Sequence, residues 1–490
     1  MKTIRSISLT LAALLAVGTT LTACGGSTGN TDTTAASGDT TAPVTEALTG
    51  RDAVMSDLPA DLDFGGETLT VLCREEEIFA REFLAEEENG EVINDAVYAR
   101  NVAVEEALNI NLEVMTRLGN WGPHTEFMNS VKSEVFAGDS SYDVISFYAY
   151  CNPTLASEGV YMNLYELEHL NLAKPWWHQA FVESATVYDK LFSVSGDIIL
   201  SYVSCRYGMY FNTVKLQEYL PGTDIYKMVD DNNWTLDSFG ELIRDVYHDV
   251  NGDTKRDDGD IYGYFLPRDS ALAMAAAGGF KNVEAEGKGG FTWNFMSERN
   301  VRLFEKLFNL IKLEGVLYNN EENRLEIFEE GNCIFYSHRL EKTELLREMK
   351  DDYGLVPNPK LDKSQEKYYS LDADYGSQVS VPITAKNPTL VGAFLEKMGE
   401  LSYKMVTPVY LDTALKGKYL RDDSSARMVD LIIEGTWQDF AEINASYIGR
   451  VVGNAFLNDL TAETLASNYE TKKPSVESKL AALLEIYKDA

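Results

Sequence analysis

The sequence predicts an α/β protein with more than one lobe, and three observations support this prediction. The chain has 490 residues, which is more than one compact core usually holds. Strand-like and helix-like segments alternate through residues 68–148, an order that predicts parallel strand pairing. The second half alternates in a similar way, and no internal repeat of fixed period is present.

In the first half, Thr68–Cys73 alternates apolar and polar residues as a strand, and residues 93–109 place apolar side chains on one helical face. Asn109 is a helix stop signal. A strand at 110–115, a helix at 128–138 and a strand at 142–148 complete the pattern. Ligands of such sheets lie at the carboxyl ends of the strands. This places Arg74, Phe147, Tyr148 and Tyr150 at a crevice.

In the second half, residues 206–212 form an aromatic strand pattern, and residues 234–250 predict a helix with Thr235 as N-cap. A strand at 261–266, a helix capped by Ser297, a helix–turn–strand unit at 323–338 and a helix at 388–403 follow. The two halves therefore have the same kind of architecture.

The chain is strongly acidic, with 43 Lys and Arg against 77 Asp and Glu, a net charge of −34. Such a surface repels phosphate backbones, so a nucleic-acid partner is not expected. The same charge argues against electrostatic docking to anionic lipid.

Residues 1–23 are predicted to be a signal peptide, because Lys2 and Arg5 precede an apolar run too short to span a bilayer stably. "LTAC" at Leu21–Cys24 resembles the bacterial lipobox, which implies cleavage before Cys24 and a lipid on its thiol. An ordinary signal peptide cut at a small-residue site is the alternative. Residues 24–60 are then a lipid-anchored tether, since residues 25–50 are Gly, Ser, Thr, Ala and Asp with little to bury.

The remaining four cysteines show no C-x-x-C spacing, which argues against a zinc site or a thioredoxin motif. They are Cys73, Cys151, Cys205 and Cys333. We expect free buried thiols, with two disulfides as the alternative outside the cytoplasm.

"DVNGDTKRDDGD" at 249–260 has the spacing of a calcium-binding loop, with oxygen side chains at Asp249, Asn251, Asp253, Asp257 and Asp260. Thr254 stands where the sharp turn usually needs Gly, and the loop is followed by a strand pattern. A calcium sensor would need a second helix there. We expect one structural Ca²⁺ that joins a helix to a strand; an acidic turn without metal is the alternative.

Several segments together resemble the carbohydrate-binding type 1 group of extracellular solute-binding lipoproteins of ABC importers. They include "FAGDSSYDVI", "MYFNTVKLQEYL", "WTLDSFGELI", "DIYGY", "FEEGNCIFY", "YGLVPNPK" and "VPITAKNPTLVGAFLEKM". The resemblance covers roughly residues 61–440 and is weaker in the last fifty. It implies a two-lobed periplasmic-binding-protein-like fold, with a hinge and a ligand cleft between the lobes. Lobe 1 would comprise residues 61–205 and 360–405, and lobe 2 residues 206–359 and 406–490. Crossings are expected near Cys205–Arg206, Tyr353–Pro359 and Tyr403–Pro408.

Sugars need planar polar partners for their hydroxyls and aromatic rings for their C–H faces. The candidate ligand-binding residues are selected by their position at strand ends, at the hinge, at the start of an apparent helix after a proline (Trp177), or where the family contacts its ligand. They are Arg74, Phe147, Tyr148, Trp177, Arg206, Arg268, Asp269, His338, Asp374 and Tyr375. Core packing or surface ion pairing is the alternative for each. Trp121 lies in a Gly/Pro loop, which makes it a further candidate for contact with a ligand.

The resemblance implies a non-enzymatic receptor that captures an oligosaccharide by lobe closure and delivers it to ABC permease subunits. We expect a monomer anchored by its lipid on the extracytoplasmic face of the bacterial membrane. The alternative is a surface-anchored glycan-degrading enzyme with a carboxylate pair. Nucleophile-elbow, zincin and P-loop motifs are absent, and the five histidines include no i, i+4 pair. An adhesin stiffened by calcium would show repeated β modules, which the sequence lacks.

Overall fold

The computed structural model describes residues 49–287, 289–319, 324–420, 422–451 and 461–489. The predicted signal peptide, Cys24 and most of the predicted tether lie outside these residues. No helix within the described ranges combines the length and apolar character needed to cross a membrane.

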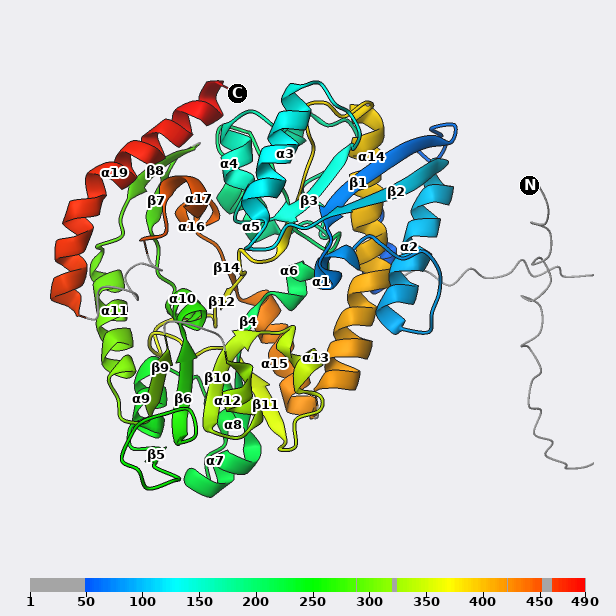
Figure 1. Cartoon of the computed structure of the whole chain (residues 1–490). Helices are drawn as coiled ribbons and strands as arrows, with labels where there is room; N and C mark the ends of the chain where they lie inside the picture. Colours follow the sequence, from blue (N-terminus) through cyan, green and yellow to red (C-terminus); the bar gives the residue numbers. More distant parts are fainter. Residues whose placement is uncertain (1–48, 288, 320–323, 421, 452–460, 490) are drawn as a thin grey trace, which may run out of the picture. The chain divides into compact units, whose positions relative to one another are not determined.

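The first sheet has the strand order β13-β3-β1-β2. Its strands are β1 (Glu67–Arg74), β2 (Ile110–Arg117), β3 (Val144–Tyr148) and β13 (Ser377–Ser380). β1 pairs in parallel with both β2 and β3, as the sequence predicts, and β13 pairs antiparallel with β3. The helices beside it are α2 (Val92–Leu108), α3 (His124–Phe136) and α14 (Pro388–Leu401) (Figure 1). α2 ends where Asn109 takes the left-handed conformation at φ 50°.

The second sheet has the order β11-β4-β10-β6-β5, and β9 also pairs with β6. Its strands are β4 (Tyr207–Asn212), β5 (Tyr247–His248), β6 (Ile261–Pro267), β9 (Val316–Asn319), β10 (Cys333–Arg339) and β11 (Tyr353–Val356). The predicted helix over 234–250 is too long, because α9 ends at Ile243 and Tyr247–His248 forms β5. The acidic loop therefore closes a β5–β6 hairpin instead of joining a helix to a strand.

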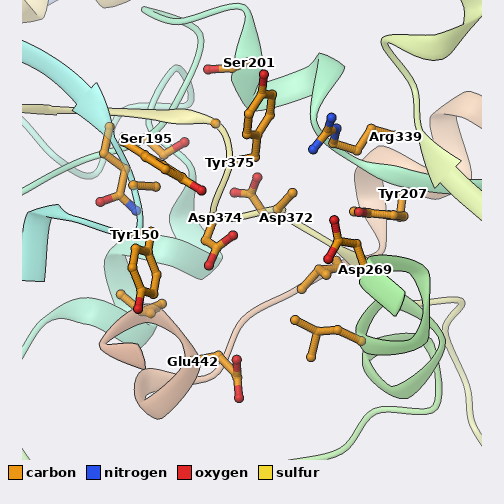
Figure 2. A pocket seen from close by; sticks show the side chains of 18 of the residues that line it. Tyr150, Ser195, Ser201, Tyr207, Asp269, Arg339, Asp372, Asp374, Tyr375 and Glu442 are labelled. Atoms are coloured by element: carbon orange, nitrogen blue, oxygen red, sulfur yellow. The ribbon is translucent and has the colours of Figure 1, made fainter. Parts of the chain in front are cut away.

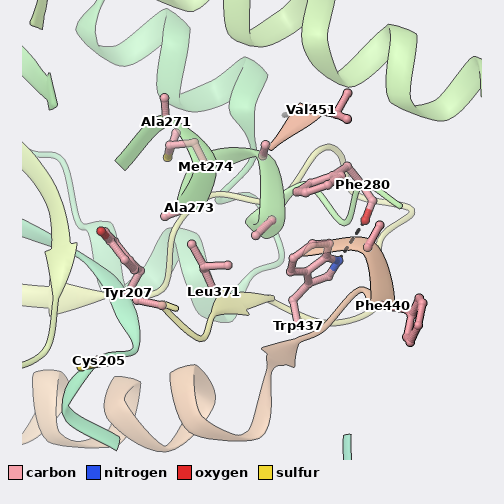
Figure 3. Close-up of a cluster of buried hydrophobic side chains, with 14 of the residues drawn as sticks. Cys205, Tyr207, Ala271, Ala273, Met274, Phe280, Leu371, Trp437, Phe440 and Val451 are labelled. Carbon is pink, nitrogen blue, oxygen red and sulfur yellow. Dashed lines mark hydrogen bonds between the residues drawn. The ribbon is translucent and has the colours of Figure 1, made fainter. Parts of the chain in front are cut away.

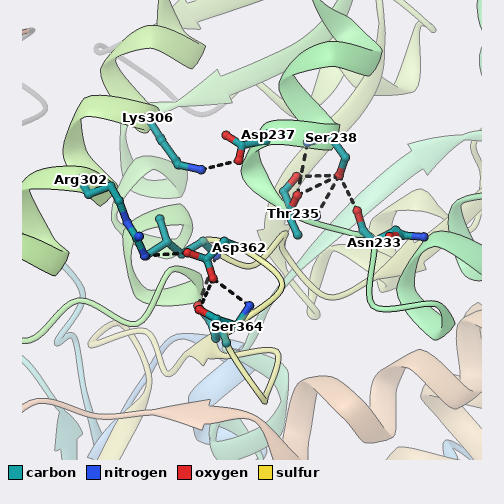
Figure 4. Close-up of polar contacts among 10 residues, drawn as sticks. Asn233, Thr235, Asp237, Ser238, Arg302, Lys306, Asp362 and Ser364 are labelled. Atoms are coloured by element: carbon teal, nitrogen blue, oxygen red, sulfur yellow. Dashed lines mark hydrogen bonds and ion pairs between the residues drawn. The ribbon is translucent and has the colours of Figure 1, made fainter.

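The start of α9 (Leu236–Ile243) is fixed by polar contacts that Figure 4 shows. The Thr235 side chain accepts from the backbone of Ser238 while the Ser238 hydroxyl accepts from the backbone of Thr235, a capping box. Lys306 on α11 (Glu298–Ile311) pairs with Asp237 at 2.5 Å. These contacts tie α9 to α11 on one side of the second sheet.

The remaining named elements are short, apart from α10, η4, α15 and α19. They are η1 (Gly50–Ala53), α1 (Glu77–Ala80), α4 (Asn152–Ser157), η2 (Leu164–Glu166), α5 (Gln179–Ala185), α6 (Ser201–Ser204), α7 (Thr213–Tyr219), α8 (Ile225–Asp230), α10 (Arg268–Ala277), β7 (Val283–Glu286), β8 (Gly290–Trp293), α12 (Leu325–Glu329), α13 (Lys342–Leu346), β12 (Ser370–Leu371), η3 (Ser402–Val406), η4 (Val409–Tyr419), α15 (Asp423–Glu434), β14 (Thr436–Trp437), α16 (Phe440–Ile443), α17 (Ala445–Ile448) and α19 (Ala462–Asp489).

The chain passes between the two sheets at three places. It leaves α6 for β4, returns from β11 through β12 to β13, and continues from α14 through η3 and η4 to α15, which packs on β11. η3 and η4 are π-helical, a form that is rare and often found at functional sites. The second passage ends at Ser377, beyond the predicted Tyr353–Pro359. The lobe boundaries given above otherwise stay a prediction.

The C-terminal segment, which the prediction assigns to lobe 2, contacts elements of both halves. α16 contacts α5, α17 contacts α4, and α19 contacts both α4 and α11. In Figure 3 the Trp437 indole lies among buried apolar side chains and donates to the Phe280 carbonyl at 2.9 Å. The ring centroids of Trp437 and Phe280 are 4.4 Å apart. β14 is thereby fixed against the end of α10.

Burial of a carboxyl on α14 makes stability depend on pH. Glu396 is 0% exposed and accepts from the Asn171 amide at 3.1 Å. Burial raises the pKa of Glu396 from an ordinary value of 4.5 to about 7. Between pH 4.5 and 7 the folded protein therefore keeps this proton while the unfolded chain releases it. The stability that the bound proton contributes is lost as pH rises through this range.

We expect Glu396→Gln to become more stable relative to the unaltered protein as pH rises from 4.5 to 7. The relative gain approaches about 3 kcal/mol, because each pKa unit corresponds to about 1.36 kcal/mol. Urea unfolding at a series of pH values measures it, with the exposed Glu106→Gln as control. A difference that stays constant with pH would contradict the raised pKa.

Candidate functional site

A cavity of about 630 Å³ lies between the two sheets and the C-terminal segment. One group of lining residues lies after β2, at and after the end of β3, and before and at the start of β13, and a second group lies at β4, β10 and α10. A third group comprises Trp437 of β14 and residues that follow it. Phe181, Ser195, Ser201 and Tyr202 also line the cavity. Figure 2 shows side chains from all three groups directed toward one space. The residues that carry the argument below are Trp121, Tyr148, Tyr150, Tyr207, Arg268, Asp269, Arg339, Asp372, Asp374, Tyr375, Gln378, Trp437, Gln438, Glu442 and Arg450.

Four aromatic rings form a continuous row along the first-sheet side of the cavity. Ring centroids are 5.9 Å apart for Trp121 and Tyr150, 6.0 Å for Tyr150 and Tyr148, and 6.2 Å for Tyr148 and Tyr375. The backbone fixes this row, because the Tyr150 amide donates to the Asp374 carbonyl at 3.1 Å. A row of this kind presents apolar faces and edges along an extended ligand.

Guanidinium groups lie over three of these rings. Arg450 is 4.5 Å from the Tyr150 centroid, Arg339 is 4.0 Å from that of Tyr375, and Arg74 is 5.2 Å from that of Tyr148. The cations stabilise the ring positions through cation–π attraction. Each also covers part of its ring.

Trp121 is the most exposed ring of the row, at 60%. Its indole stacks on His124 with 4.9 Å between centroids and 21° between planes, and the His124 Nδ1 contacts the Trp121 carbonyl. The loop Leu118–Pro123 thus holds a supported indole at the edge of the cavity. An indole face supported from behind is suited to stack on a sugar.

On the second-sheet side, α10 begins at the cavity. Arg268 and Asp269 follow Pro267, which ends β6, and both side chains are exposed. Arg339 ends β10 and pairs with Glu341 at 2.7 Å. Figure 2 places Asp269, Tyr207 and Arg339 on the same side of the space. Their oxygens and nitrogens supply both acceptors and donors for hydroxyl groups.

The C-terminal segment forms the third wall. Arg450 pairs with Asp374 across the cavity edge. The Asn282 side-chain nitrogen donates to Asp439 at 3.1 Å and to Glu442 at 3.0 Å, so the two carboxyl groups lie close together. Burial, together with the charge of Asp439, raises the pKa of Glu442 to about 7.

Asp372 joins the walls at the base of the cavity. Gln438 donates to its carboxylate at 3.2 Å, and the Arg206 guanidinium lies 3.8 Å from it. Burial raises the pKa of Asp372 above its ordinary value while Arg206 opposes this shift. With Asp374 paired to Arg450 and Arg339 to Glu341, most charges around the cavity are compensated within the protein. Such a site suits a neutral ligand rich in hydroxyl groups.

Of the ten residues predicted to bind ligand, the structure brings five to the cavity: Tyr148, Arg268, Asp269, Asp374 and Tyr375. It places the other five outside the lining, each 1% exposed or less: Arg74, Phe147, Trp177, Arg206 and His338. Phe147 stacks on Phe127 at 3.8 Å on the opposite face of β3 from Tyr148. Arg74 supports the site from behind, donating to Ser377 Oγ at 3.0 Å and to Asn120 Oδ1 at 3.2 Å.

The two-residue period of a strand predicts that Phe147 and Tyr148 point to opposite faces of the sheet. Only one of them can therefore face the cavity. Tyr150 and Trp121 had signals in the sequence, a strand end and a Gly/Pro loop. Gln438, Glu442 and Arg450 had none: they lie at or beyond the end of the family resemblance, in a segment with short elements.

The acidic loop lies apart from the cavity lining, and its oxygens bind its own backbone. Asp249 accepts from the amides of Gly252 at 2.7 Å and Thr254 at 2.8 Å, and Thr254 has φ 64°. Asp260 is 0% exposed and accepts from the Tyr247 hydroxyl at 3.0 Å. No group of three or more His, Cys, Asp or Glu in the described part of the chain is arranged to hold a metal ion. The four cysteines Cys73, Cys151, Cys205 and Cys333 are buried and free.

No protein-family profile matches the chain, and no curated protein sequence matches it. Solved structures do. An ABC substrate-binding protein from Listeria monocytogenes in complex with cycloalternan superposes with a TM-score of 0.53 and 11% identity, covering 84% of this chain and 98% of its own.

A cyclo/maltodextrin-binding protein complexed with maltotetraose gives a TM-score of 0.53 and 11% identity, with coverage of 86% and 97%. The galacto-N-biose-/lacto-N-biose I-binding protein of an ABC transporter from Bifidobacterium longum gives 0.53 and 13%, with coverage of 84% and 98%. At these identities the similarity concerns the fold. The chain therefore has the two-lobed α/β fold of periplasmic binding proteins, as its sequence predicts.

Proposed function

We propose that the protein is the carbohydrate-binding receptor of an ABC importer, which captures an oligosaccharide between its lobes and delivers it to the membrane permease. The observation that carries this proposal is the cavity between the sheets, with its aromatic row and compensated charges. The fold it shares with sugar-bound receptors supports the same function. The receptor is proposed to act as a monomer.

Ligand capture follows from the division of the lining between the lobes. Tyr148 and Trp121 belong to the first-sheet side, and Asp269 and Arg339 to the second. A sugar that contacts both groups stabilises the arrangement in which they lie closest. The permease then distinguishes a loaded receptor from an empty one by that arrangement.

One observation favours the alternative of a glycan hydrolase. Glu442 lines the cavity with a pKa of about 7, a value suited to a general acid. A second carboxylate with a free path to the sugar is also required. Asp374 is paired with Arg450 and Asp372 accepts from Gln438, while the exposed Asp269 lines the same cavity from α10. We assign Glu442 to hydrogen bonding and the protein to binding without turnover because the chain shares its fold with sugar-bound receptors.

Trp121→Ala should lower affinity for the bound oligosaccharide by about 1–3 kcal/mol, the scale of one lost stacking face. Its melting temperature should change little, because the indole is exposed. Phe147→Ala is the matched comparison and should instead cost about 3–5 kcal/mol of unfolding free energy, as expected for a buried ring. Calorimetric titration and urea unfolding measure the two effects.

Equal loss of stability in both variants would place Trp121 in the core and contradict the stacking role. Mass spectrometry of the recovered oligosaccharide should find it uncut. Cleavage that Glu442→Gln abolishes would establish the hydrolase.

The lipid anchor at Cys24 remains part of the proposal and lies outside the described residues. Cys24→Ala should release the protein from membranes without changing its melting temperature, because residues 25–50 offer little to pack. Fractionation of cells and immunoblotting measure it. Continued membrane association of the variant would rule out Cys24 as the anchor.

We also propose that the loop at 249–260 binds one Ca²⁺ that stabilises the β5–β6 hairpin. Since a cation that binds the folded state stabilises it, Ca²⁺ should raise the melting temperature modestly and a chelator should lower it. Sugar affinity should be unchanged, as the loop is not in the cavity lining. Asp253→Asn should weaken this response. If neither Ca²⁺ nor chelator changes the melting temperature of the unaltered protein, the loop is an acidic turn without metal.

A further inference from the structure

The C-terminal helix α19 runs beside both lobes. It has 28 residues, which corresponds to about 42 Å. Figure 1 draws it along one side, from the neighbourhood of α4 to that of α11. One stripe of the helix is buried along most of its length: Leu465, Tyr469, Val476, Leu480, Leu483, Leu484 and Tyr487.

The first half of α19 packs on the second-sheet side. The ring of Tyr469 lies 5.3 Å from that of Phe295, directly before α11. α19 also contacts α11 itself. α11 packs on α9 and β9, which belong to the second sheet and its helices.

The last turn of α19 packs on the first-sheet side. The Tyr487 ring lies 5.1 Å from that of Phe192, and the Lys488 ammonium lies 5.4 Å from the Tyr188 ring. Phe192 is anchored to the first sheet, because Val194 bridges to Val379 on β13. The two ends of one helix therefore bind opposite lobes.

A proline lies between the two contacts. Pro474 is exposed inside α19, after Tyr469 and before Val476. Proline has no backbone N–H, so one hydrogen bond of the helix is missing there and bending is easier. The weakest point of α19 thus separates the part on one lobe from the part on the other.

We propose that α19 is a jointed strap that restrains separation of the lobes, with Pro474 as its joint and Tyr487 as its releasable end. When the lobes separate, α19 must bend at Pro474 or lose the Tyr487 contact. The strap biases the empty protein toward the closed arrangement, and a bias of this kind changes the fraction of molecules that can admit ligand. The proposal rests on the proposed function only for this last consequence.

Single-molecule energy transfer on the ligand-free full chain tests the strap. Dyes on Glu113→Cys in β2 and Gln217→Cys in α7 report the separation of the lobes, since both positions are exposed, β2 belongs to the first sheet and α7 packs on the second. Tyr487→Ala should raise the population with separated lobes by about twofold or more. Pro474→Ala, which restores the amide, should lower it. The exposed Ser478→Ala on the same helix is the control.

Opposite effects of Tyr487→Ala and Pro474→Ala would support the strap, since the first variant releases one end of α19 and the second restores a hydrogen bond at the joint. A Pro474→Ala distribution equal to that of Ser478→Ala would overturn the joint. A Tyr487→Ala protein that stays folded with an unchanged distribution would overturn the strap. Because no sugar is used, these outcomes do not depend on whether the protein is a sugar receptor.

Discussion

The pairing of β13 with β3 is the constraint on which the cleft depends. The chain returns from the second sheet and adds Ser377–Ser380 antiparallel to Ile145–Tyr148. The Ala149 amide extends this pairing by donating to the Gly376 carbonyl at 2.9 Å. Residues 371–378 are thereby held across the cavity, and every one of them lines it. This returning segment is a part of the cavity lining that connects the two sheets.

Buried arginines contact residues of this returning segment. Arg74 is 0% exposed, donates to Ser377 and lies over the Phe79 ring. Arg206 is equally buried beside Asp372. Removing Arg206 would leave Asp372 with Gln438 as a hydrogen-bond donor but without its neighbouring cation. Removing one partner of a buried pair usually costs more than the pair itself contributes. Both residues are predicted ligand contacts, and in the structure they instead contact the cavity-lining residues Ser377 and Asp372.

Local patterns explain why much of the fold was predictable. Strand alternation at Thr68–Cys73 and the stop at Asn109 each depend on neighbouring residues alone, and the structure has β1 and α2 there. The helix predicted at 234–250 is too long because Val246 continues the apolar period of the helix. In the structure Tyr247 instead pairs with Tyr262 on β6. Such tertiary pairing overrides local preference.

The site was predictable only where a motif or a strand end marked it. Asp374, Tyr375, Arg268 and Asp269 lie at such places. Glu442 and Arg450 reach the cavity because α16 and α17 fold back against α5 and α4, and Thr154 on α4 and Ser446 on α17 are 292 positions apart. Nothing local in "AEINASYIGR" signals this contact. A prediction from local pattern therefore omits this part of the cavity lining.

The central claim is that the cleft binds a neutral sugar. Thermal unfolding against a panel of neutral oligosaccharides, amino acids and short peptides tests it most directly, because a ligand that binds only the folded state raises the melting temperature, and the rise grows with the logarithm of ligand concentration over its dissociation constant. The account predicts a concentration-dependent rise with at least one oligosaccharide. A rise with charged amino acids or peptides alone, with no response to any sugar, would contradict it.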